Sequence, residues 1–276
     1  RSERGKTVSD AREGSPSGRR SERGKTVVLE VRGLGRRFGG LEALTGVSFS
    51  VPEGEVLGVI GPNGAGKSTF VNLVTGHLKP TAGRILVDGR DLTGAKPWRV
   101  AGARVARTFQ IVKPFRGMTV RENVAVGALY GPGGAKTTTH ALSAADGVLE
   151  RVGLADKAGQ SPGELTVADA RRLELAKALA LRPRLLLLDE VMAGLRPGEI
   201  EPSLELVRGL RDEGVTILVI EHVMRAIVAV SDRILVLHEG RVLTAGPPRE
   251  VLADQRVVEA YLGHRYAKGE ETGNDS

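Results

Sequence analysis

The chain contains no cysteine, and it also lacks any long apolar segment. The missing cysteines exclude disulfide bonds, thiolate-ligated metal sites and thiol-based catalysis, which fits a reducing cytoplasm. None of the apolar runs approaches the roughly eighteen residues that a membrane-spanning helix needs. We therefore expect any role at a membrane to depend on a partner chain.

Positive charge is concentrated at the start of the chain. The formal net charge is +7, and residues 1–27 carry eight basic and four acidic residues, a net +4. This stretch is polar and repeats Arg-Ser-Glu-Arg-Gly-Lys-Thr-Val at 1–8 and 20–27. Because it has too few apolar residues to bury a core, we predict a disordered basic tail over 1–26, and a second disordered tail over 266–276. A basic arm for nucleic acid or anionic lipid is the alternative.

Residues 61–69 match the phosphate-loop pattern G-x-x-x-x-G-K-[ST]. An apolar run at 56–60 precedes them, and a helical stretch that Gly76 can end follows them. In this context the loop amides and the helix N-terminus converge on a polyphosphate, with Lys67 on the β/γ oxygens and the Ser68 hydroxyl on Mg²⁺. The predicted nucleotide-binding residues are Gly61, Pro62, Asn63, Gly64, Ala65, Gly66, Lys67, Ser68 and Thr69.

The rest of the chain predicts an α/β fold. Strand-like patterns at 27–31, 47–51 and 84–89 indicate a small β lobe, whereas the region from about 95 to 165 has helical periodicity. Buried-type strands at 185–190 and 215–220 alternate with helical segments, which is typical of a mostly parallel sheet. We predict a P-loop NTPase core with a mostly parallel sheet, an antiparallel β lobe and an inserted α-helical lobe, in one domain over 27–265.

Polar residues follow the two predicted core strands. Asp189 and Glu190 end the first strand, and His222 follows the second. Ligands of parallel sheets bind at the carboxyl ends of the strands, so these residues are expected at the same edge as the phosphate loop. Asp189 is then a candidate Mg²⁺ ligand and Glu190 a candidate general base, while His222 is either a γ-phosphate contact or a surface residue. Gln110 is a further polar candidate for the metal or the attacking water.

Taken together, these stretches resemble the ATP-binding subunits of ATP-binding-cassette (ABC) transporters. The likeness runs from about residue 28 to 263. Several motifs resemble the branched-chain (hydrophobic) amino acid importers: 36–41 (Arg-Arg-Phe-Gly-Gly-Leu), 107–110 (Arg-Thr-Phe-Gln), 118–124 (Met-Thr-Val-Arg-Glu-Asn-Val), 193–195 (Ala-Gly-Leu), 221–222 (Glu-His) and 259–263 (Glu-Ala-Tyr-Leu-Gly).

The resemblance implies roles for individual residues. It makes Phe38 the aromatic that stacks on adenine, although the sequence by itself favours a core residue there. It makes Gln110 the loop glutamine that couples to the permease, Asp189 a Mg²⁺ ligand, Glu190 the catalytic carboxylate and His222 the switch histidine. It also implies ATP and Mg²⁺ as cofactors, and a dimer of two cassettes that enclose two ATP molecules, each sealed by the other subunit's signature segment.

The signature segment is where this chain departs from the family. The family pattern Leu-Ser-x-Gly-Gln/Glu is replaced by Leu165, Thr166, Val167, Ala168 and Asp169. Ala168 places a Cβ where glycine permits close approach to the partner's nucleotide, and Asp169 adds an anion near another anion. Val191 and Arg196 also differ from the usual Pro and Asn or Asp. We therefore expect a degenerate signature and a heterodimer, with a homodimer as the alternative.

The expected function is that of an ATP-binding and ATP-hydrolysing subunit, at the cytoplasmic face of the membrane, that powers the import of branched-chain amino acids or related small solutes through a separate permease. Its partners would be a second cassette, permease subunits and, indirectly, an extracellular solute-binding protein, with no nucleic acid. The alternatives are a lipid or lipopolysaccharide exporter ATPase, a non-transport cassette ATPase that acts on nucleic acid, and a weakly catalytic regulatory subunit. The sequence leaves the transported substrate open.

Overall fold

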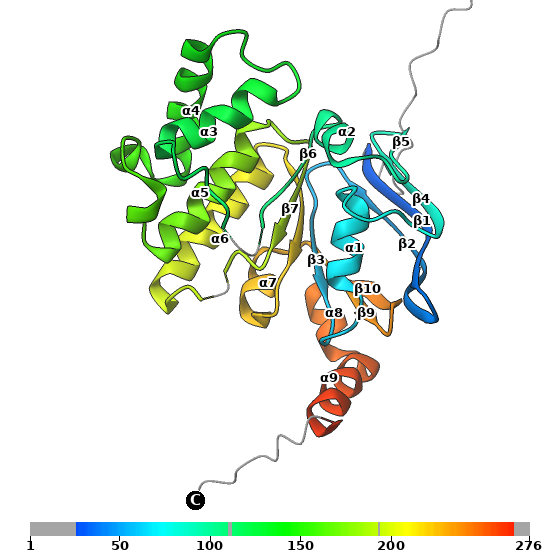
Figure 1. The fold of residues 1–276 in the computed structure, drawn as a ribbon. Helices are drawn as coiled ribbons and strands as arrows, with labels where there is room; N and C mark the ends of the chain where they lie inside the picture. The colour runs from blue at the N-terminus through cyan, green and yellow to red at the C-terminus, as the bar shows by residue number, and fades with distance from the viewer. Residues whose placement is uncertain (1–25, 110–111, 193, 268–276) are drawn as a thin grey trace, which may run out of the picture.

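The computed structural model describes residues 26–109, 112–192 and 194–267. Figure 1 shows two sheets with a group of helices beside the larger one. Within the described part of the chain, no helix is both long and apolar enough to cross a bilayer.

The larger sheet has six strands in the order β10-β9-β3-β8-β7-β6. Neighbouring strands are parallel except for the β9–β10 pair, which is antiparallel. The central strands are fully buried apolar runs, as expected for a parallel sheet covered on both faces. The strand bounds are β3 (Val56–Ile60), β6 (Val105–Arg107), β7 (Leu185–Asp189), β8 (Thr216–Ile220), β9 (Arg233–His238) and β10 (Arg241–Gly246).

The smaller sheet is antiparallel, with the order β2-β1-β4-β5. Its two long strands form a hairpin with several register shifts, and their inward side chains pack on helix α1 and the larger sheet. The expected α/β class, with a mostly parallel sheet and an antiparallel β lobe, is therefore confirmed. The strand bounds are β1 (Val27–Phe38), β2 (Leu41–Pro52), β4 (Ala82–Val87) and β5 (Arg90–Asp91).

Helices cover the larger sheet and form the separate group on one side of it (Figure 1). Small and aliphatic side chains of α3, α4 and α5 share one apolar core that continues onto β7 and β8. The helix bounds are α1 (Lys67–Val74), α2 (Pro97–Gly102), α3 (Val120–Tyr130), α4 (Thr138–Val152), α5 (Val167–Ala180), α6 (Pro197–Asp212), α7 (Met224–Val230), α8 (Pro248–Ala253) and α9 (Gln255–Ala267), with short 3₁₀ turns at Ala155–Lys157 and Pro162–Glu164.

The expected start of the helical lobe needs a correction. Residues 105–107, inside the range 95–165, form strand β6 and pair with β7, so this stretch belongs to the larger sheet. The strand was missed because three residues are too few to show a periodicity. The expected tails lie almost wholly outside the described residues. Thr26 accepts a hydrogen bond from the Glu53 amide, and α9 continues through Ala267.

Candidate functional site

The phosphate loop connects β3 to α1, as the sequence predicts. Two of its glycines are required by the backbone. Gly61 has φ 155°, and a Cβ there would lie 2.1 Å from the carbonyl oxygen of Leu237 on β9. Gly66 has φ 101°, and a Cβ there would lie 2.7 Å from the carbonyl oxygen of Ala43. Close packing against the neighbouring main chain thus fixes the conformation of the loop through contacts within the chain itself.

The N-terminus of α1 is open to an anion. The residue before the helix is Gly66, which has no side chain to accept hydrogen bonds from the first-turn amides. Unsatisfied amides and the positive end of the helix dipole favour phosphate at this point. The Lys67 ammonium donates to the carbonyl oxygens of Gly61 at 2.6 Å and Pro62 at 3.0 Å, so it stands across the loop. Burial lowers the pKa of Lys67, and the Glu190 and Asp189 carboxylates oppose this shift.

The structure brings the predicted acidic residues to the edge of the sheet that carries the loop. Strands β3, β8 and β7 are adjacent and parallel, so their carboxyl ends meet. Asp189 is the last residue of β7 and is buried, and Glu190 follows it. His222 lies just beyond β8, with its Nδ1 3.9 Å from Oε1 of Glu190. The His222 side chain is 61% exposed, which leaves its ring available to a ligand.

Glu190 leaves the line of its strand. Its main-chain amide donates to the carbonyl oxygen of Ile220 at 2.9 Å, but its φ of 51° lies in the left-handed region. A non-glycine residue there carries a local backbone cost, which the surrounding structure must offset. The main chain therefore takes a left-handed turn at Glu190, directly after Asp189 ends β7.

Arg107 is a part of this site that the sequence did not identify as functional. It ends β6, and its guanidinium donates to Oδ2 of Asp189 at 2.7 Å and to Oδ1 of Asn72 on α1 at 2.7 Å. The next residue, Thr108, accepts a hydrogen bond from the Asp189 amide. Short strand β6 thus orients both the main chain and the side chain of Asp189. The only signal in the sequence was the position of Arg107 three residues before Gln110.

The residues at this edge fit Mg²⁺. A hydroxyl on α1, Ser68, and a buried carboxylate, Asp189, are hard oxygen donors of the kind that Mg²⁺ takes in small numbers, completing its shell with phosphate and water. Among the described residues, no group of three or more acidic or histidine side chains is placed to hold a metal ion by itself. Gln110, the other predicted metal contact, lies outside the described residues.

Phe38 is at the end of β1, on the surface. Its side chain is 42% exposed, which makes a core role wrong, and the Arg36 guanidinium lies 4.5 Å from the ring centroid. An exposed aromatic ring supported by a cation on one face can accept a flat ligand on the other face.

The altered signature segment begins helix α5. Thr166 is the N-cap: its hydroxyl accepts from the Asp169 amide at 3.2 Å and donates to Oδ2 of Asp169 at 2.7 Å. Val167 is exposed at the first position of the helix. The hydroxyl of Thr166 is therefore occupied within the helix, and an apolar side chain stands beside it.

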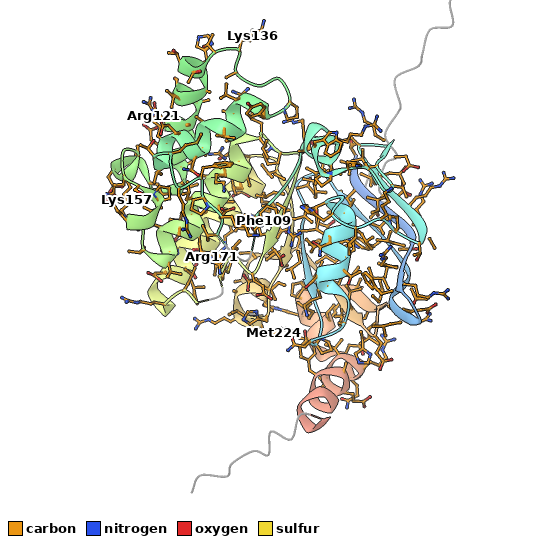
Figure 2. All side chains as sticks on the ribbon, in the orientation of Figure 1. Phe109, Arg121, Lys136, Lys157, Arg171 and Met224 are labelled. Atoms are coloured by element: carbon orange, nitrogen blue, oxygen red, sulfur yellow. The ribbon has the colours of Figure 1, made fainter. Side chains whose placement is uncertain are left out.

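Asp169 does not project toward solvent, which corrects the expectation of an anion facing the partner's nucleotide. It is buried, and its carboxylate is paired with the Lys157 ammonium and, at 3.7 Å, with Arg172. Burial alone would raise the pKa of Asp169, but the hydrogen bonds from Lys157 and Thr166 together lower it. Lys157, labelled in Figure 2, comes from the 3₁₀ turn that follows α4. The charge of Asp169 is thus neutralised inside its own chain.

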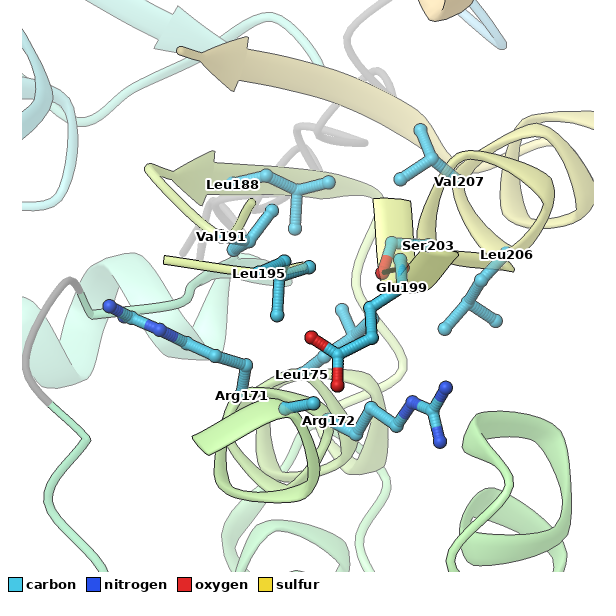
Figure 3. A pocket seen from close by; sticks show the side chains of 11 residues that line it. Arg171, Arg172, Leu175, Leu188, Val191, Leu195, Glu199, Ser203, Leu206 and Val207 are labelled. Carbon is cyan, nitrogen blue, oxygen red and sulfur yellow. Dashed lines mark hydrogen bonds between the residues drawn. The ribbon is translucent and has the colours of Figure 1, made fainter. Parts of the chain in front are cut away.

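A pocket lies between α5, α6 and the segment after β7 (Figure 3). It is not at the phosphate loop. Its lining includes two of the residues that depart from the family pattern, Ala168 and Val191, together with Leu175, Leu188 and Leu195. The altered positions of the two segments are therefore in one apolar environment.

Comparison with known proteins gives concordant matches. The ABC transporter family matches residues 44–193, and the family described as branched-chain amino acid ATP-binding cassette transporter matches residues 241–267. The chain is 41% identical to the high-affinity branched-chain amino acid transport ATP-binding protein BraF of Pseudomonas aeruginosa, with 86% of this chain and 98% of that protein covered. It is 41% identical to LivG of Escherichia coli, a protein of the same description, with the same coverage.

Solved structures agree with these matches. The ADP conformation of an ATP-binding cassette of an ABC transporter superposes with a TM-score of 0.78 at 31% identity, covering 86% of this chain and 99% of that one. A nucleotide-free cassette from an ABC transporter gives a TM-score of 0.77, also at 31% identity, with the same coverage.

Proposed function

The chain belongs to the ABC transporter family as an ATP-binding, ATP-hydrolysing subunit, and from that premise we propose that it powers the import of branched-chain amino acids or related small solutes. The observation that carries the proposal is the meeting of the phosphate loop with Asp189 and Glu190 at one sheet edge. The similarity to BraF and LivG over almost their whole length supports the class of solute.

Residues 61–69 hold the polyphosphate of ATP, with the Lys67 ammonium exchanging its carbonyl contacts for phosphate oxygens. Phe38 stacks on the adenine. Glu190 orients the attacking water and accepts its proton as the new phosphorus–oxygen bond forms and the bond to the β-phosphate oxygen breaks, which releases ADP. His222, within 3.9 Å of Glu190, contacts the transferred phosphate.

Ser68 and Asp189 would hold Mg²⁺, with Gln110 as a further contact. When bound, the ion neutralises charge on the β- and γ-phosphates. The chain's own contribution is orientation, because Arg107 and Thr108 fix the Asp189 carboxylate and amide.

A second, different cassette completes the site. In this arrangement the partner's signature segment closes on ATP at residues 61–69, and this chain offers its own α5 N-terminus to the partner's ATP. Thr166 already uses its hydroxyl within α5, and Val167 and Ala168 stand where close approach is needed. The partner's site is therefore the weakly hydrolytic one, and the dimer is asymmetric.

A separate permease receives the conformational change that accompanies ATP hydrolysis. The chain itself lies on the cytoplasmic face of the membrane. Exposed apolar side chains flank the position of Gln110 in the sequence: Phe109, Phe115 and Met118. Phe109 and Arg171 are close together (Figure 2), and Arg171, on α5, donates to the Phe109 carbonyl oxygen at 3.4 Å. This hydrogen bond joins Phe109 to α5, the helix that begins at the signature segment.

The test is to purify the transporter through this chain and measure ATP hydrolysis with candidate solute-binding proteins. Stimulation by a leucine-, isoleucine- or valine-loaded binding protein supports the proposal. Stimulation by lipid or lipopolysaccharide instead would replace the importer with an exporter.

The altered signature favours one second candidate, a regulatory subunit that binds ATP with little turnover. In that case the altered signature would slow the partner's site, this chain's own site would turn over little, and Glu190→Gln would leave the low turnover of the complex nearly unchanged.

A further inference from the structure

Glu221 is a buried carboxyl group that no step of the proposed chemistry uses. It follows the last residue of β8 directly and is only 2% exposed. Its Oε1 accepts a hydrogen bond from the main-chain amide of Met192 at 2.8 Å. Met192 is two residues after Glu190, on the segment that leaves β7. The carboxyl thus reaches from the end of one core strand to the loop that follows its neighbour.

Glu221 also directly precedes His222 in the chain, and the charge and main chain of His222 oppose the effect of burial on the Glu221 pKa. A second bond joins the ends of the two strands, because the amide of Glu190 donates to the carbonyl oxygen of Ile220, the last residue of β8. The side chains of Glu190 and His222, 3.9 Å apart, are therefore held between two cross-strand connections.

Stability alone gives no reason for a carboxyl group here. Its Oε2 is buried and, within the described residues, has no hydrogen-bond partner. Burial of an unsatisfied polar atom costs as much as the hydrogen bond at Oε1 contributes, or more. An apolar residue would remove the cost but leave the Met192 amide without an acceptor. The gain from Glu221 is a fixed position for the segment after Glu190.

We propose that Glu221 is a positioning residue that fastens the loop of Glu190 to the loop of His222 and so sets the separation of these two side chains around the transferred phosphate. This inference rests on the proposed roles of Glu190 and His222. It assigns no direct contact with the nucleotide to Glu221, because the phosphate loop is held by other contacts.

The test compares Glu221→Ala with Glu221→Gln in the full chain, within the purified transporter complex. We would measure kcat and KM for ATP, the affinity for a fluorescent ATP analogue, and the melting temperature. Glu221→Ala should lower kcat by about ten- to a hundredfold, since small misplacements of reacting groups have effects of this size. KM and analogue affinity should stay within about threefold of the unchanged complex, because the loop of residues 61–69 is untouched. Glu221→Gln keeps an acceptor oxygen for Met192 and should recover most of kcat.

Asp232 offers a matched control at the opposite end of the sheet. Its Oδ2 accepts from the amide of Val56 at 2.8 Å, where β3 begins. Asp232→Ala removes the same kind of bond and should lower the melting temperature without lowering kcat. If the Asp232 and Glu221 alanine variants lose kcat equally, or if Glu221→Gln is no better than Glu221→Ala, the positioning role is wrong.

Two further variants keep the outcomes separable. If Glu221→Ala does not fold, Glu221→Asp replaces it: one methylene shorter, it should lose kcat while Glu221→Gln keeps it, and equal kcat for the two overturns the inference. Glu190→Gln is measured alongside. If ATP turnover survives Glu190→Gln, the proposed function is wrong. If Glu190→Gln abolishes turnover but Glu221→Ala keeps the kcat of the unchanged complex, only the role of Glu221 is wrong.

Discussion

The Arg107 guanidinium and the Asp189 carboxylate form an ion pair at 2.7 Å, and each side chain is only 12% exposed. The pair joins the edge strand β6 to β7 across 82 positions of the chain. The other arm of Arg107 holds Asn72 on the helix that follows the phosphate loop. The carboxylate assigned to Mg²⁺ is therefore oriented by a residue that also contacts the nucleotide-binding helix.

Arg107→Met should destabilise the chain by about 3 kcal/mol, because it leaves a largely buried carboxylate without its counter-charge. Chemical denaturation of the full chain measures the change. Arg121→Met is the control, since the Arg121–Asp146 pair is about 40% exposed at both ends and should cost less than about 1 kcal/mol. The double variant Arg107→Met with Asp189→Asn should lose less than the sum of the single changes. If Arg107→Met and Arg121→Met lower the free energy of unfolding equally, the Arg107–Asp189 pair has no special importance for stability.

Glu190→Gln should lower turnover of the transporter complex by about 10²- to 10⁴-fold, the range for removal of a general base. ATP affinity should change by less than about threefold, since the phosphates are held by residues 61–69. Lys67→Ala is the contrasting variant: it should lose affinity for an ATP analogue because it removes the ammonium that stands across the loop. If the Glu190→Gln variant retains its turnover, a residue other than Glu190 is the general base.

The edge of the sheet where the site lies could be predicted from the sequence. The runs at 56–60, 185–189 and 216–220 are apolar and short, and buried parallel strands place their carboxyl ends together. The apolar pattern of these runs and this rule together predict that Asp189, Glu190 and His222 lie beside the phosphate loop. This prediction does not depend on the order of the six strands in the sheet.

The contacts that orient these residues could not be predicted. Arg107 reaches Asp189 only because β6 adds to the edge of the sheet, and a three-residue strand leaves no periodic signal. Asp169 turns inward because a 3₁₀ turn places Lys157 beside it, a contact between segments that pattern analysis treats separately. Glu221 looks like a surface residue next to His222 until its burial is known.

The signature segment gives a prediction about pairing. This chain alone should hydrolyse ATP slowly and a mixed dimer with an intact cassette faster, because Thr166, Val167 and Ala168 close poorly on a partner's nucleotide. Restoring Thr166→Ser and Ala168→Gly should raise the turnover of the isolated chain. Asp169 is left unchanged so that its pair with Lys157 is kept. If the isolated chain hydrolyses ATP as fast as the mixed dimer, the proposed asymmetry is wrong.

The last prediction concerns pH and Glu221. Burial, the largest influence, raises the pKa of Glu221 above its ordinary value of 4.5, and the Glu190 carboxylate adds to this, while the Met192 amide and His222 oppose it. The folded chain therefore binds the proton more tightly than the unfolded chain, so the contribution of Glu221 to stability is largest at low pH. It falls as pH rises from 4.5 through the raised pKa. Glutamine does not titrate, so the melting temperature of Glu221→Gln should gain on that of the unchanged chain as pH rises from about 4 to 8. Asp232→Asn supplies the comparison for general effects of removing a carboxylate. A difference between Glu221→Gln and the unchanged chain that is constant across this range would show that Glu221 has the same pKa in the folded and unfolded chain, so that burial does not raise it.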